Sequence, residues 1–220
     1  MNAHTILDSV LVLVILLDLA MLAVSRLAMC IRLFALQSLL LALLSPAVES
    51  SHGNMPGVHE LLIAAGALGL KVFLIPWVLL RILRTGEIHQ EIEPFIGFTA
   101  SVLVGAALVV GSFAITAHLP LPTERVSDLL LPVSASTILV GLLILISRVK
   151  AVTQVVGFLV VENGIYLFGL MLLKQTPLLV ELGILLDLFV GVFIMAIVVY
   201  HIRREFDHMD THLLDALKET

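Results

Sequence analysis

The chain has 220 residues, of which 60% are hydrophobic and 13% are charged, and its mean hydropathy is +1.14. Soluble domains carry charged residues at about a quarter of their positions, so this composition excludes a soluble domain and indicates an integral membrane protein. The net charge of −5 comes without a basic cluster beyond Arg203 and Arg204, which argues against nucleic acid as a partner. The single cysteine, Cys30, excludes an internal disulfide and a thiolate-held zinc or iron–sulfur site.

Apolar windows bounded by charged residues, proline and glycine predict an all-α membrane protein with about seven transmembrane helices. Each window is close to the length of about 20 residues that a spanning helix needs. In chain order the predicted helices cover residues 5–25, 27–48, 58–83, 95–118, 129–148, 150–173 and 178–202. The first window could be mistaken for a secretory signal, but it lacks a basic leading region and contains Asp8 and Asp18, so we expect a retained helix.

Basic residues in the joints between these helices predict the orientation of the chain, because lysine and arginine resist translocation. Arg125 and Lys174 lie on one side of the membrane. The opposite side collects Arg26, Arg32, Arg81, Arg84, Arg148, Lys150, Arg203, Arg204 and Lys218. This bias places the amino terminus outside and the carboxyl terminus in the cytoplasm. The tail at 205–220 contains acids and histidines, but no second ligand cluster accompanies it, so we expect a solvated amphipathic end rather than a metal site.

Parts of the chain match each other at nearly equal shifts, which predicts a parallel tandem repeat of a three-helix module. Residues 24–26 and 146–148 share Ser-Arg, and residues 71–84 align with residues 191–204. The first three and the last three predicted helices then run in the same directions, as a parallel duplication requires. The predicted divisions are an amino-terminal module at 1–84, a spacer helix with its loops at 85–128, a carboxyl-terminal module at 129–204 and a cytoplasmic tail at 205–220.

Several ionisable residues lie at membrane depth. Inserting each one costs about 2.5–3.5 kcal/mol of free energy on insertion scales, so such residues usually face a partner or water. Glu162, Asp187 and Lys71 lie near the middle of their predicted helices, and Asp18 lies about two turns from the end of the first one. A buried carboxylate near an opposite charge can take up and release protons, so these residues predict a proton or ion pathway. The alternative is that Lys71 is a fixed ion partner of Asp187 or Glu162 and only holds helices together.

Uncharged polar residues within the predicted helices offer hydrogen bonds between helices, alongside an ordinary packing role. The candidates are Asn163, Gln37, Thr137, Ser134 and Ser136. Glu181 lies near the outer surface, where it lines an entrance to the pathway or is a wetted carboxylate. The sequence has no zinc signature, phosphate-binding loop or nucleophile elbow, so we expect no metal, cofactor or catalytic site on this chain.

The last three predicted helices resemble a small three-helix subunit. Residues 157–163, Gly-Phe-Leu-Val-Val-Glu-Asn, resemble the second helix of the K subunit of respiratory complex I and of the C subunit of multisubunit cation/proton antiporters. Residues 187–191, Asp-Leu-Phe-Val-Gly, and the basic ending at 201–204 resemble that subunit's third helix. The pattern differs in two places, because Glu162 lies one turn after the subunit's acid and Asp187 replaces its glutamate. A shift of one turn keeps Glu162 on roughly the same helix face.

Over its whole length the chain resembles the hydrogenase-4 component E family of formate hydrogenlyase-type and other membrane-bound nickel–iron hydrogenase complexes. The resemblance implies a subunit without an active site of its own, in the cytoplasmic membrane of a bacterium or archaeon. Its partners would be antiporter-like large subunits, a quinone-reductase-like anchor subunit and a peripheral arm holding the nickel–iron and iron–sulfur centres. Its buried charges would couple redox energy to proton or sodium movement. The alternatives are a stand-alone cation- or proton-coupled secondary transporter and a purely structural scaffold.

Overall fold

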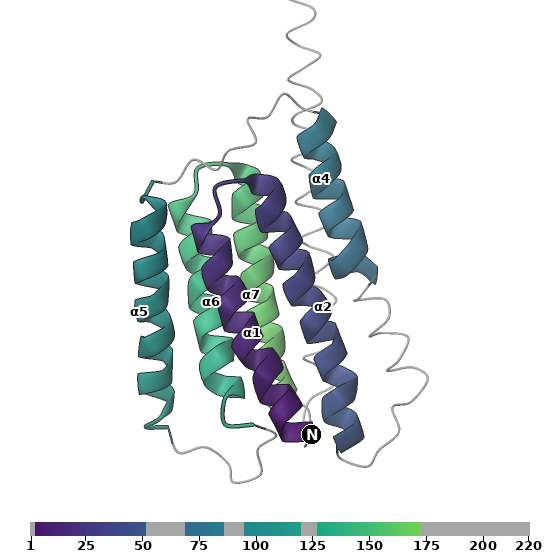
Figure 1. The fold of residues 1–220 in the computed structure, drawn as a ribbon, viewed down its shortest axis with the longest axis vertical. Coiled ribbons are helices and arrows are strands. Elements are labelled where there is room, and N and C mark those ends of the chain that lie inside the picture. Colours follow the sequence, from purple (N-terminus) through teal and green to yellow (C-terminus); the bar gives the residue numbers. More distant parts are fainter. Residues whose placement is uncertain (1–2, 52–68, 86–94, 120–126, 173–220) are drawn as a thin grey trace, which may run out of the picture.

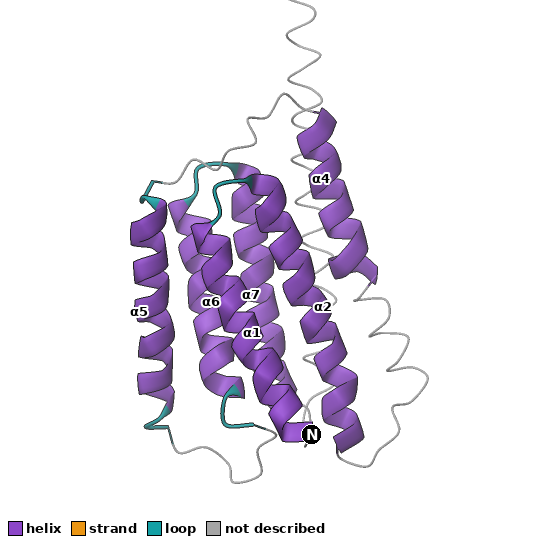
Figure 2. Cartoon of the chain, in the orientation of Figure 1, coloured by secondary structure: helices purple, strands orange, loops and turns teal. Residues whose placement is uncertain are grey.

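The computed structural model describes residues 3–51, 69–85, 95–119 and 127–172, and these ranges contain helices and no strand (Figure 2). The elements are α1 (Ala3–Ala23), α2 (Leu27–Ser51), the π-helix η1 (Gly69–Leu74), α4 (Ile75–Thr85), α5 (Phe98–Thr116), α6 (Leu130–Ser147) and α7 (Ala151–Leu172). The helices α1, α2, α5, α6 and α7 are long and apolar enough to cross a membrane. The prediction of an all-α membrane protein is therefore confirmed. The predicted helix at 178–202 lies outside the described residues, so the total of seven stays a prediction.

Two helical hairpins form the centre of the described fold (Figure 1). A short joint at residues 24–26 connects α1 to α2, and a second at residues 148–150 connects α6 to α7. The hairpins pack with α1 against α6 and α2 against α7, while α5 covers α1 and α6 and η1 with α4 covers α2. Figure 1 shows both joints at the same end, so α1 runs parallel to α6 and α2 runs parallel to α7. This arrangement is what the predicted repeat requires, and the repeat itself stays a prediction.

The second predicted helix, 27–48, ends slightly later in the structure, because α2 continues to Ser51. Pro46 therefore lies inside a helix. Membrane helices tolerate proline because local adjustments and neighbouring groups re-satisfy the freed backbone carbonyl. A proline is consequently a weaker helix terminator here than it would be in a soluble protein.

The predicted helix at 58–83 is described from Gly69 onward, and the first residues of the described part are not α-helical. It begins as the π-helix η1 and becomes the α-helix α4 at Ile75, directly before Pro76. Because proline has no N–H, an α-helical pattern would leave the carbonyl of Val72 without its donor. The wider π pattern moves the pairing on by one residue and occurs frequently at functional sites. Lys71 lies within this turn.

The helices α6 and α7 approach each other closely at glycines. A Cβ atom at Gly157 would lie 2.8 Å from the backbone nitrogen of Leu145, and one at Gly164 would lie 2.8 Å from the backbone nitrogen of Ile138. Backbone atoms cannot turn aside as a flexible side chain can, so these positions admit no larger residue without moving a helix. Small residues at such contacts are the usual means of packing membrane helices. The close contact fixes the position of Glu162 and Asn163, which lie between the two glycines on α7.

We expect Gly157→Ala to lower the stability of the chain by about 1–3 kcal/mol, the usual cost of overpacking a tight contact. The measurement is detergent-titrated unfolding of the full chain followed by circular dichroism. The matched control is Gly111→Ala on α5, where nothing lies within 4 Å of the added Cβ. Alanine is the better helix former by up to about 1 kcal/mol, so the control should be neutral or stabilised. Equal behaviour of the two variants would contradict the close packing of α6 on α7.

Candidate functional site

A layer of buried polar side chains crosses the hairpin bundle between two apolar clusters. On each of α1, α2, α6 and α7, these polar residues lie in sequence between residues of one apolar cluster and residues of the other. None of them is more than 3% exposed. The members of this polar layer are Asp18 on α1, Gln37 and Ser38 on α2, Ser134, Ser136 and Thr137 on α6, and Glu162 and Asn163 on α7.

A chain of hydrogen bonds within the polar layer joins the four hairpin helices. Thr137 Oγ1 donates to Asp18 Oδ2 at 2.7 Å, and Gln37 Nε2 donates to Asp18 Oδ1 at 2.8 Å. Asn163 Nδ2 donates to Gln37 Oε1 at 3.3 Å and lies 3.2 Å from Ser38 Oγ. Donors and acceptors match along this series, because Gln37 turns its NH₂ group toward the Asp18 carboxyl and its oxygen toward the NH₂ group of Asn163. The hairpins are therefore joined by polar contacts as well as by apolar packing.

An ion pair lies on α7, the helix that carries Asn163, which is the last residue in this series of hydrogen bonds. Lys71 Nζ is 2.7 Å from Glu162 Oε1, and the two side chains are 13% and 3% exposed. The turn that carries Lys71 packs on α2, and its side chain reaches Glu162 on α7. The sequence left Asp187 and Glu162 open as partners of Lys71, and the structure pairs it with Glu162. Asp187 and Glu181 lie outside the described residues.

The predicted ionisable residues thus occupy two different surroundings. Glu162 is paired with a cation, whereas Asp18 is held by two neutral donors. Asp18 does not touch the ion pair, but the hydrogen-bonded chain reaches Asn163, the residue next to Glu162. Two carboxyl groups in one polar layer, connected through amides, can respond to each other's charge. Among the described residues, no group of histidine, cysteine, aspartate and glutamate is placed to hold a metal ion.

The uncharged candidates divide into two groups. Asn163, Gln37 and Thr137 form hydrogen bonds between helices. Ser134 Oγ and Ser136 Oγ instead donate to carbonyls of their own helix, at Leu131 and Val133. A helical serine reaches the carbonyl three residues earlier without any help from a neighbouring helix, which explains the difference.

The sequence did not identify Arg148 as a buried residue. It was grouped with the basic residues of the joints, yet it is 1% exposed. Its Nη2 donates to the carbonyl of Leu22 at 2.8 Å, and its guanidinium lies 5.0 Å from the centre of the Phe98 ring. Leu22 is in the last turn of α1, where the helix dipole favours a positive charge. Burial lowers the pKa of Arg148, but a guanidinium keeps its proton at neutral pH. No sequence signal separates Arg148 from Arg26, which is exposed.

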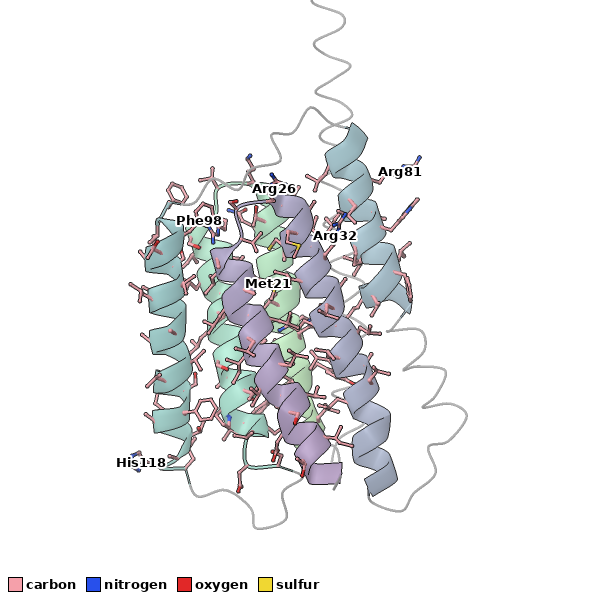
Figure 3. The ribbon with its side chains drawn as sticks, viewed as in Figure 1. Met21, Arg26, Arg32, Arg81, Phe98 and His118 are labelled. Atoms are coloured by element: carbon pink, nitrogen blue, oxygen red, sulfur yellow. The ribbon has the colours of Figure 1, made fainter. Side chains whose placement is uncertain are left out.

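Other basic residues gather at one end of the bundle. Figure 3 shows Arg26, Arg32 and Arg81 toward this end and His118 at the opposite end. Arg26 lies in the α1–α2 joint, and the α6–α7 joint with Lys150 lies at the same end (Figure 1). The arrangement agrees with the grouping of basic residues in the sequence.

Comparison with known proteins found relatives that match most of the chain. No family model and no solved structure matches it. A protein of Mycobacterium tuberculosis described as uncharacterized protein Rv0085 is 32% identical over 192 residues, which cover 86% of this chain and 84% of that protein. The hydrogenase-4 component E proteins of Escherichia coli K12 and Shigella flexneri are each 27% identical over 186 residues, which cover 84% of this chain and 84% of theirs. The chain belongs to the hydrogenase-4 component E family.

Proposed function

We propose that the chain is a membrane-arm subunit of a membrane-bound hydrogenase or complex I-like oxidoreductase, and that it contributes buried charges to coupled proton or sodium translocation. Support for the assembly comes from relatives named hydrogenase-4 component E and from the helices that are long and apolar enough to cross a membrane. The observation that carries the translocation role is the ion pair between Lys71 and Glu162. Redox chemistry would take place on partner chains that hold the nickel–iron and iron–sulfur centres.

The position of the ion pair favours a role in transport. Glu162 lies in the middle of the 22-residue helix α7, the depth at which a charge is most expensive. Adding a proton to Glu162, or removing one from Lys71, would break this ion pair. A buried charge that loses its partner costs several kcal/mol, so proton movement at this pair would change the preferred arrangement of the helices around it. Such a link between protonation and helix packing is what energy coupling requires.

Three further acids extend the proposed pathway. Asp18 is the second carboxyl of the polar layer. Asp187, on the segment that resembles the third helix of the K subunit, is the next member, and Glu181 would line its entrance. The proposed orientation places the amino terminus outside and the carboxyl terminus in the cytoplasm, so the end with Arg26 and Arg81 faces the cytoplasm of a bacterial or archaeal cell.

The assembly can be tested by purifying a tagged chain from its native host in mild detergent and identifying its partners by mass spectrometry. We expect antiporter-like large subunits, a quinone-reductase-like anchor subunit and a hydrogenase arm. Recovery of the tagged chain alone, under conditions in which other membrane complexes survive, would overturn the assembly and favour a stand-alone transporter.

We expect Glu162→Gln to abolish ion movement while the complex still assembles and turns over substrate. Glutamine keeps the shape of the side chain but cannot change its charge. The measurement is the number of ions moved per hydrogen molecule formed or consumed in inverted membrane vesicles, scaled to the amount of assembled complex.

The matched control is Asp128→Asn, which neutralises an exposed acid before α6. This variant should retain the wild-type ratio. An unchanged ratio in Glu162→Gln would contradict the translocation role and support a structural scaffold.

A further inference from the structure

Asp18 is held by neutral partners alone among the described residues. Its side chain is 0% exposed. Gln37 Nε2 donates to one carboxyl oxygen at 2.8 Å and Thr137 Oγ1 lies 2.7 Å from the other. In the described part of the chain no salt bridge reaches this carboxyl. Asp18 therefore differs from Glu162, which has a cation beside it.

The elements packed against α1 bring few ionisable groups toward Asp18. Neither α5 nor α6 contains an ionisable side chain. Arg148, at the end of α6, binds the α1 carbonyl of Leu22, which lies one turn beyond Asp18. The other ionisable residues on α1 and α2 are His4, Asp8, Cys30, Arg32 and Glu49. Of these, Cys30 is buried and Arg32 is exposed, and Asp8 is about 15 Å from Asp18 along the helix.

Two opposing effects act on the charge of Asp18. Burial in an apolar bundle favours the neutral carboxyl, whereas donors on both oxygens favour the carboxylate. Thr137 can serve either form, because a hydroxyl has one proton to donate and lone pairs to accept. With a proton on Oδ2, Asp18 would donate to Thr137 Oγ1, and the Thr137 hydroxyl would turn to a carbonyl of the preceding turn, as helical threonines do. Gln37 donates to Oδ1 in both forms, so no heavy atom has to move.

We propose that Asp18 is a proton-binding site and that Thr137 reverses its hydrogen bond when the proton arrives or leaves. Uptake places one proton on Oδ2 and removes the negative charge. Release returns the proton to water or to the next proton-binding group of the pathway. The inference rests on the proposed function and names the proton as the ion carried at this position.

The hydrogen bonds also argue against a metal cation at Asp18. Gln37 presents an NH₂ group to the carboxyl, and a cation would be repelled by that group. Hard cations require several oxygen ligands around them. The distances of 2.7 and 2.8 Å are those of direct hydrogen bonds between donor and acceptor.

The test is pH-dependent infrared difference spectroscopy of the full chain in lipid nanodiscs, with and without sodium chloride. We expect the wild-type spectrum to contain a protonated-carboxyl stretch that is lost in Asp18→Asn. In Thr137→Val, which keeps the shape but lacks the hydroxyl, the band should move to higher frequency because its hydrogen bond is gone. Thr137→Ser retains the hydroxyl and should keep the wild-type band, which distinguishes the hydrogen bond from a packing effect.

Three results would overturn the proposal. The carboxyl signal could be unchanged in Asp18→Asn, which would mean that Asp18 stays in one charge state. The band could have the same frequency in wild type, Thr137→Val and Thr137→Ser, which would remove the role of the hydroxyl. Sodium could suppress the band in wild type, which would indicate a cation site. None of these results bears on the coupling ratio of Glu162→Gln, so failure at Asp18 and failure of the proposed function are separate observations.

Discussion

Replacing Lys71 with methionine should lower the stability of the chain by about 3–5 kcal/mol, the usual cost of removing one partner from a buried ion pair. Methionine fills a similar volume but leaves the Glu162 carboxylate without the cation that now lies 2.7 Å away. Unfolding of the full chain, titrated with a denaturing detergent and followed by circular dichroism, measures the effect.

The double variant Lys71→Met/Glu162→Gln provides the control. It removes both charges, so we expect it to recover most of the stability that Lys71→Met loses, since neutral replacement of a buried pair costs far less than breaking it. If the double variant were as unstable as the sum of the two single variants, the charges would not interact and the pair would not exist in the folded protein. If the proposed translocation role is correct, the same variant should not move ions, because the ion pair between Lys71 and Glu162 is gone.

Hydropathy predicted the spanning helices well because each is a long and predominantly apolar run. The predicted helices at 129–148 and 150–173 correspond to Leu130–Ser147 and Ala151–Leu172. Hydropathy did not supply two details that backbone hydrogen bonding decides. The helix α2 runs past Pro46 to Ser51, and the turn before Pro76 is a π-helix. Both cases depend on how the backbone replaces a missing N–H, which a count of apolar residues does not describe.

The candidate residues were visible in the sequence because ionisable groups are rare in apolar helices. Their grouping was not visible. Lys71 reaches Glu162 only because its turn packs on α2, and Asp18 meets Thr137 only because α1 packs on α6. Except for the contact between Asp18 and Gln37, the hydrogen bonds within the polar layer join residues more than 100 positions apart in the sequence. One chain without knowledge of helix neighbours cannot supply such pairings.

The polar layer also explains why the two hairpins share one register. A slip of either hairpin by one turn would move Thr137 away from Asp18 and Asn163 away from Gln37, leaving buried polar groups facing apolar clusters. An unmatched buried polar group costs about 1–3 kcal/mol. Apolar packing in a membrane is less selective, since lipid is as apolar as leucine. The polar contacts therefore favour the observed alignment over neighbouring ones.

Gln37→Leu is the substitution that should disturb this alignment most. Gln37 is the only described residue bonded to both Asp18 and Asn163, and leucine of similar size removes both contacts. Asp18 loses a donor, and Asn163 keeps Ser38 alone among the described residues, so two buried groups lose partners at a cost of about 1–3 kcal/mol each. We expect a total loss of roughly 2–5 kcal/mol in the detergent-titrated unfolding of the full chain.

The matched control for this variant is Gln154→Leu on α7. Gln154 is exposed, and its Nε2 donates to the carbonyl of Arg148 at 3.1 Å, so the same chemical change removes one partly buried hydrogen bond. Its expected cost is about 0.5–1.5 kcal/mol. Equal losses in the two variants would show that Gln37 does not connect the hairpins. A larger loss in Gln37→Leu, accompanied by a shift of the Asp18 carboxyl band, would show that the stability of the bundle and the proton site depend on the same amide.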